Sequence, residues 1–261
     1  MVDIVRRILL FLIPFSVAFW FIHEKFEATL VRSIQNGLAG FYSVDGIIFG
    51  LIVAFVIQRE WEIWTNLSEA VQTEIDATRE MWKWSAYAEP SLSEKAKSHL
   101  ETYLRLLVEG WNKGEVRTRS PEIDAELDKL RSLLASMSLS MENLGVQLRN
   151  AFTNLVQARN RRLNYSNQHM PGILKRIVVF TDILLIILSL FIGVNNLYVD
   201  YIFTASIGLL VFTLIIVVDD LDNPFRKGTW HLTTEGYENL LLEIERLKTH
   251  PLSSSESGEY F

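Results

Sequence analysis

Apolar residues gather in four blocks along this chain, and each block is about as long as a membrane span. An α-helix rising about 1.5 Å per residue needs about 20 residues to cross a hydrocarbon core of about 30 Å. The second block contains a single charged residue, Asp45. The blocks are Ile8–Ile22, Leu38–Ile57, Ile177–Val194 and Leu197–Val218. The pattern predicts an all-α membrane protein with four transmembrane helices.

The helix of the second block is predicted to continue beyond the membrane. After Arg59, apolar residues recur every four positions among charged ones, which is the pattern of an amphipathic helix. No Pro or Gly interrupts Leu51–Ala88. One helix should therefore cross the lipid, enter the cytoplasm and end near Ala86. The recurring apolar residues are Ile63, Leu67, Val71 and Ile75.

Polar residues dominate the chain between the second and third blocks, and their spacing predicts further soluble helices. Pro90 should break the long helix, and Ser93 is a candidate N-cap for the next one. An amphipathic helix is predicted at Thr234–Lys248, followed by a tail without fixed structure at Pro251–Phe261. The intervening helices are predicted at Ser93–Trp111, Glu122–Ser136 and Ser140–Asn167, with a loop at 112–121.

Turn signals mark two connections between the apolar blocks. Gln35-Asn36-Gly37 predicts a turn before the second block, and Asn195-Asn196 predicts a tight antiparallel hairpin of the third and fourth. The predicted organisation is transmembrane helices 1 and 2 at 1–58, a cytoplasmic helical domain at 59–172, transmembrane helices 3 and 4 at 173–222, and a cytoplasmic amphipathic helix with a flexible tail at 223–261.

Basic residues beside the blocks predict the orientation, because cytoplasmic loops carry an excess of Lys and Arg. Both termini and residues 59–172 are accordingly expected in the cytoplasm. A cleaved secretory signal is the alternative for the N-terminus, but bulky aromatic residues within Ala18–Ile22 stand where cleavage needs small ones. The basic residues on the cytoplasmic side are Arg6, Arg7, Arg59, Lys175, Arg176, Arg226 and Lys227, against Lys25 and Arg32 on the other.

Composition excludes several functional classes. The chain has no cysteine, which excludes disulfides, thiolate metal sites and cysteine nucleophiles. Its formal charge of −6 argues against nucleic acid as a partner, because nucleic-acid binders carry a basic face. The five histidines are scattered, and no HExxH, phosphate-loop or dinucleotide motif occurs. We therefore predict no enzyme activity and no cofactor.

Several motifs, taken in order, resemble one known family. Residues 49–56 read Phe-Gly-Leu-Ile-Val-Ala-Phe-Val, and residues 157–163 read Gln-Ala-Arg-Asn-Arg-Arg-Leu. A Met-Pro precedes the third block, and Asp-Asn-Pro-Phe-x-x-Gly follows the fourth. Together these motifs resemble the bacterial bestrophin-like family, and more distantly the bestrophin anion channels, over roughly residues 38–241.

The resemblance implies four spans, a cytoplasmic helical domain and a homo-oligomer, a pentamer by analogy, in the bacterial inner (plasma) membrane. The implied partners are membrane lipid, other copies of the chain and small ions. The leading hypothesis is a passive ion channel for small anions such as chloride. The alternative is a non-conducting membrane adaptor whose residues 59–172 bind a cytoplasmic partner.

The resemblance also places a pore neck on the second helix. Matching the motif at Arg59 carries the bestrophin neck positions onto Ser43, Ile47 and Leu51. At 100° per residue these three share a helix face, where an apolar ring could gate by dewetting. Asp45 lies about 160° from that face and should point away from a pore. The alternative is that Ile47 and Leu51 only contact lipid or neighbouring helices.

Charged residues near the blocks are the remaining candidates. Asp219, Asp220 and Asp222 are weak metal candidates, since Arg226 and Lys227 follow where bestrophins carry acidic residues near their calcium site; ion pairs with these cations are the alternative. Arginines could attract anions to a cytoplasmic vestibule or bind lipid head groups, or could form a solvated helix face. These arginines are Arg59, Arg159, Arg161 and Arg162.

Two more carboxylates lie inside the apolar blocks, where charges are costly. Asp182 lies close enough in sequence to pair with Lys175 and Arg176, and Asp200 close enough to the outer edge to be interfacial. A proton or cation relay through these groups is the less favoured alternative.

Overall fold

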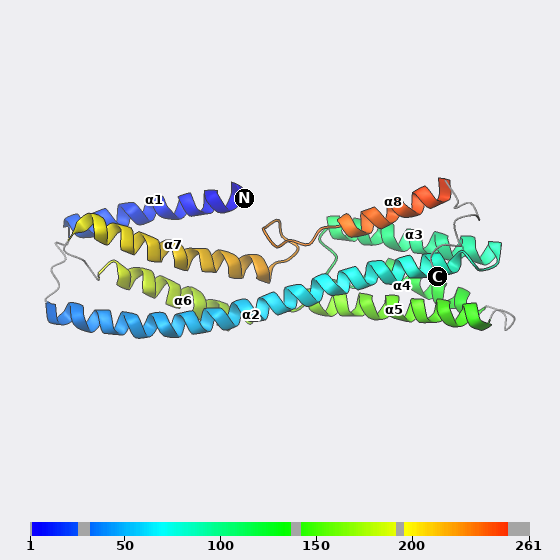
Figure 1. Cartoon of the computed structure of the whole chain (residues 1–261), viewed down its shortest axis with the longest axis horizontal. Coiled ribbons are helices and arrows are strands. Elements are labelled where there is room, and N and C mark those ends of the chain that lie inside the picture. The colour runs from blue at the N-terminus through cyan, green and yellow to red at the C-terminus, as the bar shows by residue number, and fades with distance from the viewer. Residues whose placement is uncertain (1, 26–31, 137–141, 192–195, 250–261) are drawn as a thin grey trace, which may run out of the picture. The chain divides into compact units, whose positions relative to one another are not determined.

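The computed structural model consists of α-helices throughout the residues it describes, which are 2–25, 32–136, 142–191 and 196–249 (Figure 1). No strand occurs within these ranges. The helices form two compact units. Unit 1 comprises residues 1–64 and 169–231, and unit 2 comprises residues 65–168 and 232–261. The all-α prediction is confirmed.

Unit 1 contains α1 (Val2–Lys25), the first part of α2 (Arg32–Ser85), α6 (Gly172–Ser189) and α7 (Leu197–Asp222). α7 packs against both α1 and α6 (Figure 1). One apolar cluster joins α2, α6 and α7, and a second joins α1 to the end of α6 and to α7. The buried members of these clusters are Phe49, Val53, Val56, Met170, Val178, Leu185, Val211 and Val218, and Phe15, Phe19 and Leu190.

Among the described residues, three helices are long and apolar enough to cross a membrane: α1, α2 and α7. α6 has 18 residues and carries three charged residues, Lys175, Arg176 and Asp182, so it lacks an 18-residue stretch with as few charges as the other three helices contain. Its predicted outer end, residues 192–194, and Asn195 of the predicted hairpin turn lie outside the described residues.

One of two sequence signals for chain breaks is wrong. Gln35-Asn36-Gly37 is helical, because α2 begins at Arg32 and the helix-forming residues on both sides outweigh a local turn preference. The predicted break at Pro90 is confirmed, since α2 ends at Ser85, but α3 (Pro90–Asn112) already begins at Pro90, where its missing N–H leaves no bond unmade. Ser93 is therefore buried inside the helix instead of capping it.

Unit 2 packs α3, α4 (Pro121–Ala135), α5 (Glu142–Ser166) and α8 (Glu235–Thr249) with the second part of α2. Ser120 caps α4 by accepting a hydrogen bond from the Ile123 N–H. α8 approaches α2 closely, since a Cβ on Gly236 would lie 2.6 Å from Ile75 Cδ1. The predicted tail from Pro251 lies outside the described residues. The apolar core includes Leu100, Leu104, Leu130, Leu155 and Leu240.

Candidate functional site

The three predicted neck residues share an exposed face of α2. Ile47 is 73% exposed and Leu51 is 59% exposed in the single chain, and Ser43 is exposed as well. The Ser43 hydroxyl donates to the Ala39 carbonyl oxygen one turn earlier (2.8 Å), so its polar group is satisfied within the helix. A large apolar surface is thus left uncovered by the chain itself.

The opposite face of α2 is the one that unit 1 buries. Phe49, Val53 and Val56 are buried against α6 and α7. A Cβ added at Gly46 or Gly50 would meet nothing within 4 Å, so no helix of the same chain uses these glycines for close approach. The remaining large apolar residues exposed on α2 between 41 and 55 are Phe41, Val44, Ile48 and Phe55.

Asp45 lies away from the neck residues, close to the buried face of α2. Its side chain is half-buried, and its Oδ2 is buried without a hydrogen-bond partner among the described residues.

The C-terminal end of α7 is held by ion pairs within unit 1. Lys175 Nζ donates to Asp219 Oδ1 (3.2 Å) and to Asp222 Oδ2 (3.1 Å), and the Met170 N–H donates to Asp222 Oδ1 (3.0 Å). Arg226 also donates to Asp219. These contacts tie α6 to the end of α7.

Asp220 makes its contacts with residues other than Lys175 and Arg226. Its Oδ2 accepts from the Thr229 N–H (3.1 Å), and Arg7 Nη1 lies 3.9 Å from Oδ1. A Cβ at Gly228 would lie 3.0 Å from this carboxyl group, so the turn after α7 fits tightly around it.

These contacts bear directly on the weak metal candidates Asp219, Asp220 and Asp222. Each carboxylate already binds cations or N–H groups of the chain, and the described residues contain no group of three His, Cys, Asp or Glu side chains suited to a metal ion. The predicted pairing with Arg226 is found for Asp219. The other cations involved are Lys175 and Arg7.

Three tryptophans pack beside this end of unit 1. The Trp64 indole N–H donates to the Trp230 carbonyl oxygen (2.7 Å), and Trp61 stacks on Trp64 with ring centroids 5.4 Å apart. Such a cluster suits the interface between lipid and water, where indole rings are enriched.

The four arginines singled out in the sequence do not form one surface. Arg162 and Arg159 are buried in unit 2, while Arg161 is exposed. Arg159 binds Asp124 (2.5 Å), and its Nε has no partner among the described residues. Arg59 is in unit 1 and is exposed, and its Nη1 lies 3.5 Å from Glu62 Oε2. The prediction of a solvent-facing basic cluster is therefore wrong for Arg159 and Arg162, because residues three apart on α5 share its buried face.

Arg162 belongs to a fully buried polar network in unit 2. Its Nε donates to Glu74 Oε2 (2.5 Å), and its Nη1 donates to the Val116 carbonyl oxygen (3.0 Å). The Tyr103 and Tyr237 hydroxyl groups also donate to Glu74, the latter at 2.9 Å. The network joins α2, α3, α5 and α8 in the centre of the unit.

The electrostatics of this network favour a charged Arg162–Glu74 pair with neutral tyrosines. Burial, and then the Glu74 charge, raise the pKa of Tyr103 and of Tyr237 well above 10.0. Burial alone would lower the pKa of Arg162, but the Glu74 carboxylate reverses this and raises it. All four side chains thus have partners suited to their charge, which identifies the network as structural.

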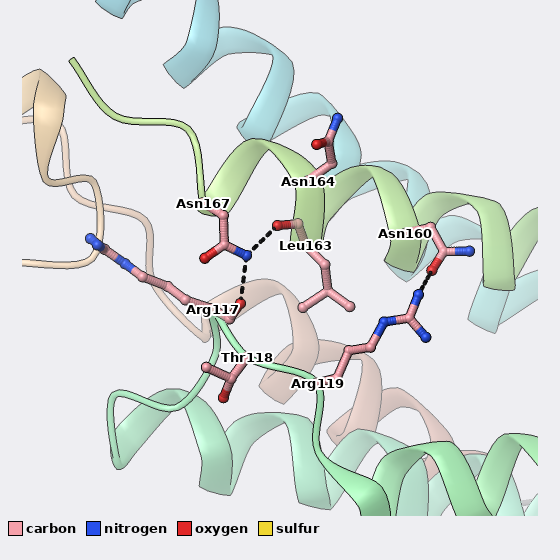
Figure 2. A pocket seen from close by; sticks show the side chains of 7 residues that line it. All are labelled: Arg117, Thr118, Arg119, Asn160, Leu163, Asn164 and Asn167. Atoms are coloured by element: carbon pink, nitrogen blue, oxygen red, sulfur yellow. Dashed lines mark hydrogen bonds between the residues drawn. The ribbon is translucent and has the colours of Figure 1, made fainter. Parts of the chain in front are cut away.

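A shallow polar pocket lies on unit 2 between α5 and the loop before α4 (Figure 2). Arg119 Nη2 donates to Asn160 Oδ1 (2.9 Å), and Asn167 Nδ2 donates to the Arg117 carbonyl oxygen (2.8 Å). Figure 2 shows the guanidinium groups of Arg117 and Arg119 pointing in opposite directions, so they do not form one anion clamp. No acidic side chain is among the seven lining residues, which are Arg117, Thr118, Arg119, Asn160, Leu163, Asn164 and Asn167.

Asp182 and Asp200, the two carboxylates in the later apolar blocks, differ in their hydrogen-bond partners. Asp200 is buried near the start of α7, and its Oδ2 lies 3.0 Å from His23 Nε2 on α1. Asp182 is completely buried, and neither carboxyl oxygen has a hydrogen-bond partner among the described residues. The predicted pairing of Asp182 with Lys175 is wrong, because Lys175 binds Asp219 and Asp222 instead.

Comparison with known proteins gives a consistent result. A sequence model of the Bestrophin-like domain family matches residues 9–229. Three crystal structures of mutants of a bacterial Bestrophin homolog from Klebsiella pneumoniae have the same fold. The first is 15% identical with a TM-score of 0.72, covering 95% of this chain and 97% of that one.

The second structure is 13% identical with a TM-score of 0.74, covering 95% of this chain and 99% of that one. The third is 16% identical with a TM-score of 0.69, covering 93% and 99% of the two chains. No curated protein sequence matches this chain.

Proposed function

Because this chain belongs to the Bestrophin-like domain family, we propose that it assembles in the membrane as a homo-oligomeric ion channel whose α2 helices surround the pore. The observation that carries the proposal is the uncovered apolar face of α2. Ile47 and Leu51 are largely exposed in the single chain, although the helix around them is apolar enough to cross a membrane. Copies of α2 gathered around an axis would turn this face toward a central passage.

Ser43, Ile47 and Leu51 are the proposed neck of that passage. An apolar ring of this kind gates by excluding water when it is narrow. α6 and α7 pack against the other side of α2, where they leave the neck face accessible to the axis.

Small anions such as chloride are the proposed substrate. Asp45 is the acidic residue of this stretch of α2, and it lies away from the neck residues on the helix, so it does not add negative charge to the ring. Exposed Arg59 and Arg161 would add positive potential on the cytoplasmic side.

The proposed arrangement has four spans, with α6 as the third, and both termini and unit 2 in the cytoplasm of a bacterial cell. The native chain has no cysteine, so single introduced cysteines report their side of the membrane cleanly. Lys83→Cys should react with a membrane-impermeant maleimide only in permeabilised cells. Labelling of Lys83→Cys in intact cells would overturn this orientation.

Planar bilayer recording of the purified protein tests conduction. We expect currents above the empty-membrane background, with a reversal potential in a chloride gradient that follows the chloride equilibrium. Absence of current at both voltage signs from an assembled, folded oligomer would overturn the channel and leave a membrane-anchored adaptor as the better description.

A matched pair of variants tests the neck. Ile47→Thr adds a hydroxyl to the proposed ring and should raise single-channel conductance by making the ring easier to wet. Ile48→Thr makes the same change on an exposed residue about 100° around the helix, and should leave conductance near that of the unmodified chain. Equal effects of the two variants would contradict the assignment of the neck.

A further inference from the structure

Asp182 is the most unusual buried group in the described part of unit 1. It lies on α6 between Val178 and Leu185, four and three residues away, and therefore on the same face of the helix. Both of these neighbours belong to the apolar cluster that joins α6 to α2 and α7. The carboxyl group is completely buried at that face, and neither oxygen has a hydrogen-bond partner within the described ranges.

The helices around Asp182 offer no counter-charge at its depth. α6 has no other ionisable residue after Arg176, which lies six residues, or about 9 Å along the axis, from Asp182. α2 has none between Asp45 and Arg59, and Asp45 is itself acidic. The ionisable groups that bound the apolar stretches are Arg176 on α6, Tyr42, Asp45 and Arg59 on α2, Tyr201, Asp200 and Asp219 on α7, and Arg7 and His23 on α1.

The basic groups of α6 and α1 at the ends of the apolar stretches already have other partners. Lys175 binds Asp219 and Asp222, and Arg176 Nε donates to the Gly172 carbonyl oxygen (3.2 Å). His23 binds Asp200 (3.0 Å) at the other end of α7. None of them can neutralise Asp182 without giving up a contact of its own.

We propose that Asp182 is a proton-binding site, with the carboxyl group held as the neutral acid in the folded chain at neutral pH. An unpaired carboxylate is strongly disfavoured in an apolar interior, and the group avoids that penalty by taking up a proton. The neutral acid also gains an O–H that can donate to a carbonyl oxygen of the preceding helical turn, which a carboxylate cannot do.

A proton fits this site better than a larger ligand. The side chain is completely buried within one chain, so a group from a second copy has no access to it. The described residues hold no set of three acidic or histidine side chains that would bind a metal ion. The proposal does not depend on conduction, because it concerns the resting protonation of one side chain.

Infrared spectroscopy of the full chain in lipid tests the proposal directly. Aspartate carrying heavy carbon in its side-chain carboxyl group shifts the bands of aspartate away from those of glutamate. At neutral pH we expect a label-shifted carboxylic acid band that disappears in Asp182→Asn and persists in Asp200→Asn and Asp45→Asn. Loss of an ionised carboxylate band in Asp182→Asn, with the acid region unchanged, would overturn the proposal.

Two further measurements keep the test decisive if Asp182→Asn does not fold. Asp182→Glu retains a carboxyl group but removes it from the labelled set, so the label-shifted acid band should again disappear. In the unmodified labelled chain, absence of any label-shifted acid band at neutral pH would overturn the proposal without any variant. Neither readout measures current, so failure here is distinguishable from failure of the channel assignment.

Discussion

In the part of the chain that the structure describes, each unit buries one carboxylate completely, but in opposite chemical surroundings. Glu74 in unit 2 accepts hydrogen bonds from Arg162, Tyr103 and Tyr237. Asp182 in unit 1 accepts none, and apolar side chains surround it. Burial therefore does not by itself say whether an acidic residue is charged. The donors within reach decide it, and the four variants below test that conclusion from the largest expected effect to the smallest.

The largest effect is expected for Arg162→Met. The substitution leaves the Glu74 charge buried without its ion pair, which typically costs about 3–5 kcal/mol of folding free energy. Hydrogen exchange of α3 and α8 peptides in the detergent-solubilised protein should show the loss of protection across unit 2. Arg161→Met, on an exposed neighbour, should change stability by less than about 0.5 kcal/mol. Equal stability of the two variants would contradict the role given to Arg162.

Tyr103→Phe should have the next largest effect. It removes a buried hydroxyl that donates to a charged carboxylate, and such bonds contribute about 1.5–3 kcal/mol. The same hydrogen-exchange measurement applies. Tyr87→Phe is the matched control, because that side chain is exposed at the end of α2 and should tolerate the change. An unchanged exchange pattern in Tyr103→Phe would mean that the other donors suffice for Glu74.

Asp182→Leu should change stability in the opposite direction. The substitution removes a buried polar group that has no partner and keeps a similar shape, so it should stabilise unit 1 by about 1 kcal/mol. Thermal unfolding in mild detergent measures the change. Asp200→Leu is the control, and it should destabilise the protein because His23 loses its bonded carboxylate. A clear destabilisation by Asp182→Leu would indicate a partner for Asp182 that the proposal lacks.

The smallest effect concerns how the stability of unit 2 depends on pH, through Glu126 on α4. Burial alone would raise the pKa of Glu126, but hydrogen bonds from Lys129 and His99 outweigh it and lower the pKa below 4.5. Because the pKa is lower in the folded chain than in the unfolded one, this stabilisation is complete above that value. It is lost as the pH falls below 4.5 toward the folded pKa.

Glu126→Gln should therefore remove part of the acid sensitivity of unit 2. The stability lost at neutral pH should be below about 1 kcal/mol, since Lys129 is largely exposed and such pairs are screened. Unfolding measured by hydrogen exchange from neutral to acidic pH checks this. Glu80→Gln, which breaks an exposed pair with Lys83, should leave the pH dependence unaltered. An identical acid response of the unmodified chain and Glu126→Gln would contradict the expectation.

The sequence predicted the helices well, because their signals are long and repetitive. The apolar stripe after Arg59 and the absence of Pro and Gly were sufficient to predict a continuous α2, which ends at Ser85. Short signals were less reliable. An Asn-Gly pair lies inside α2, and Pro90 begins a helix, because neighbouring residues decide how a local preference is used.

The surroundings of charged residues were harder to predict from the sequence. Arg159, Arg161 and Arg162 are close together in the chain, but helical periodicity places Arg159 and Arg162 at buried positions and Arg161 at an exposed one. The burial of Glu74 could have been predicted, since it lies seven residues from buried Leu67 and seven from buried Met81, on the same face of α2. Its partners on α3, α5 and α8 depend on tertiary packing and could not be inferred from local pattern. The neck residues Ser43, Ile47 and Leu51 remain predictions.

The network around Glu74 also fixes when unit 2 can be completed during synthesis. Glu74 emerges from the ribosome early, Arg162 much later, and Tyr237 only after the whole of α6 and α7. Until α8 is translated, the carboxylate lacks one of its donors and the apolar side chains of the unit lack one covering helix. Unit 2 therefore finishes folding only after the whole of α7 has left the ribosome, and a chain truncated before Tyr237 would be expected to leave that unit incomplete.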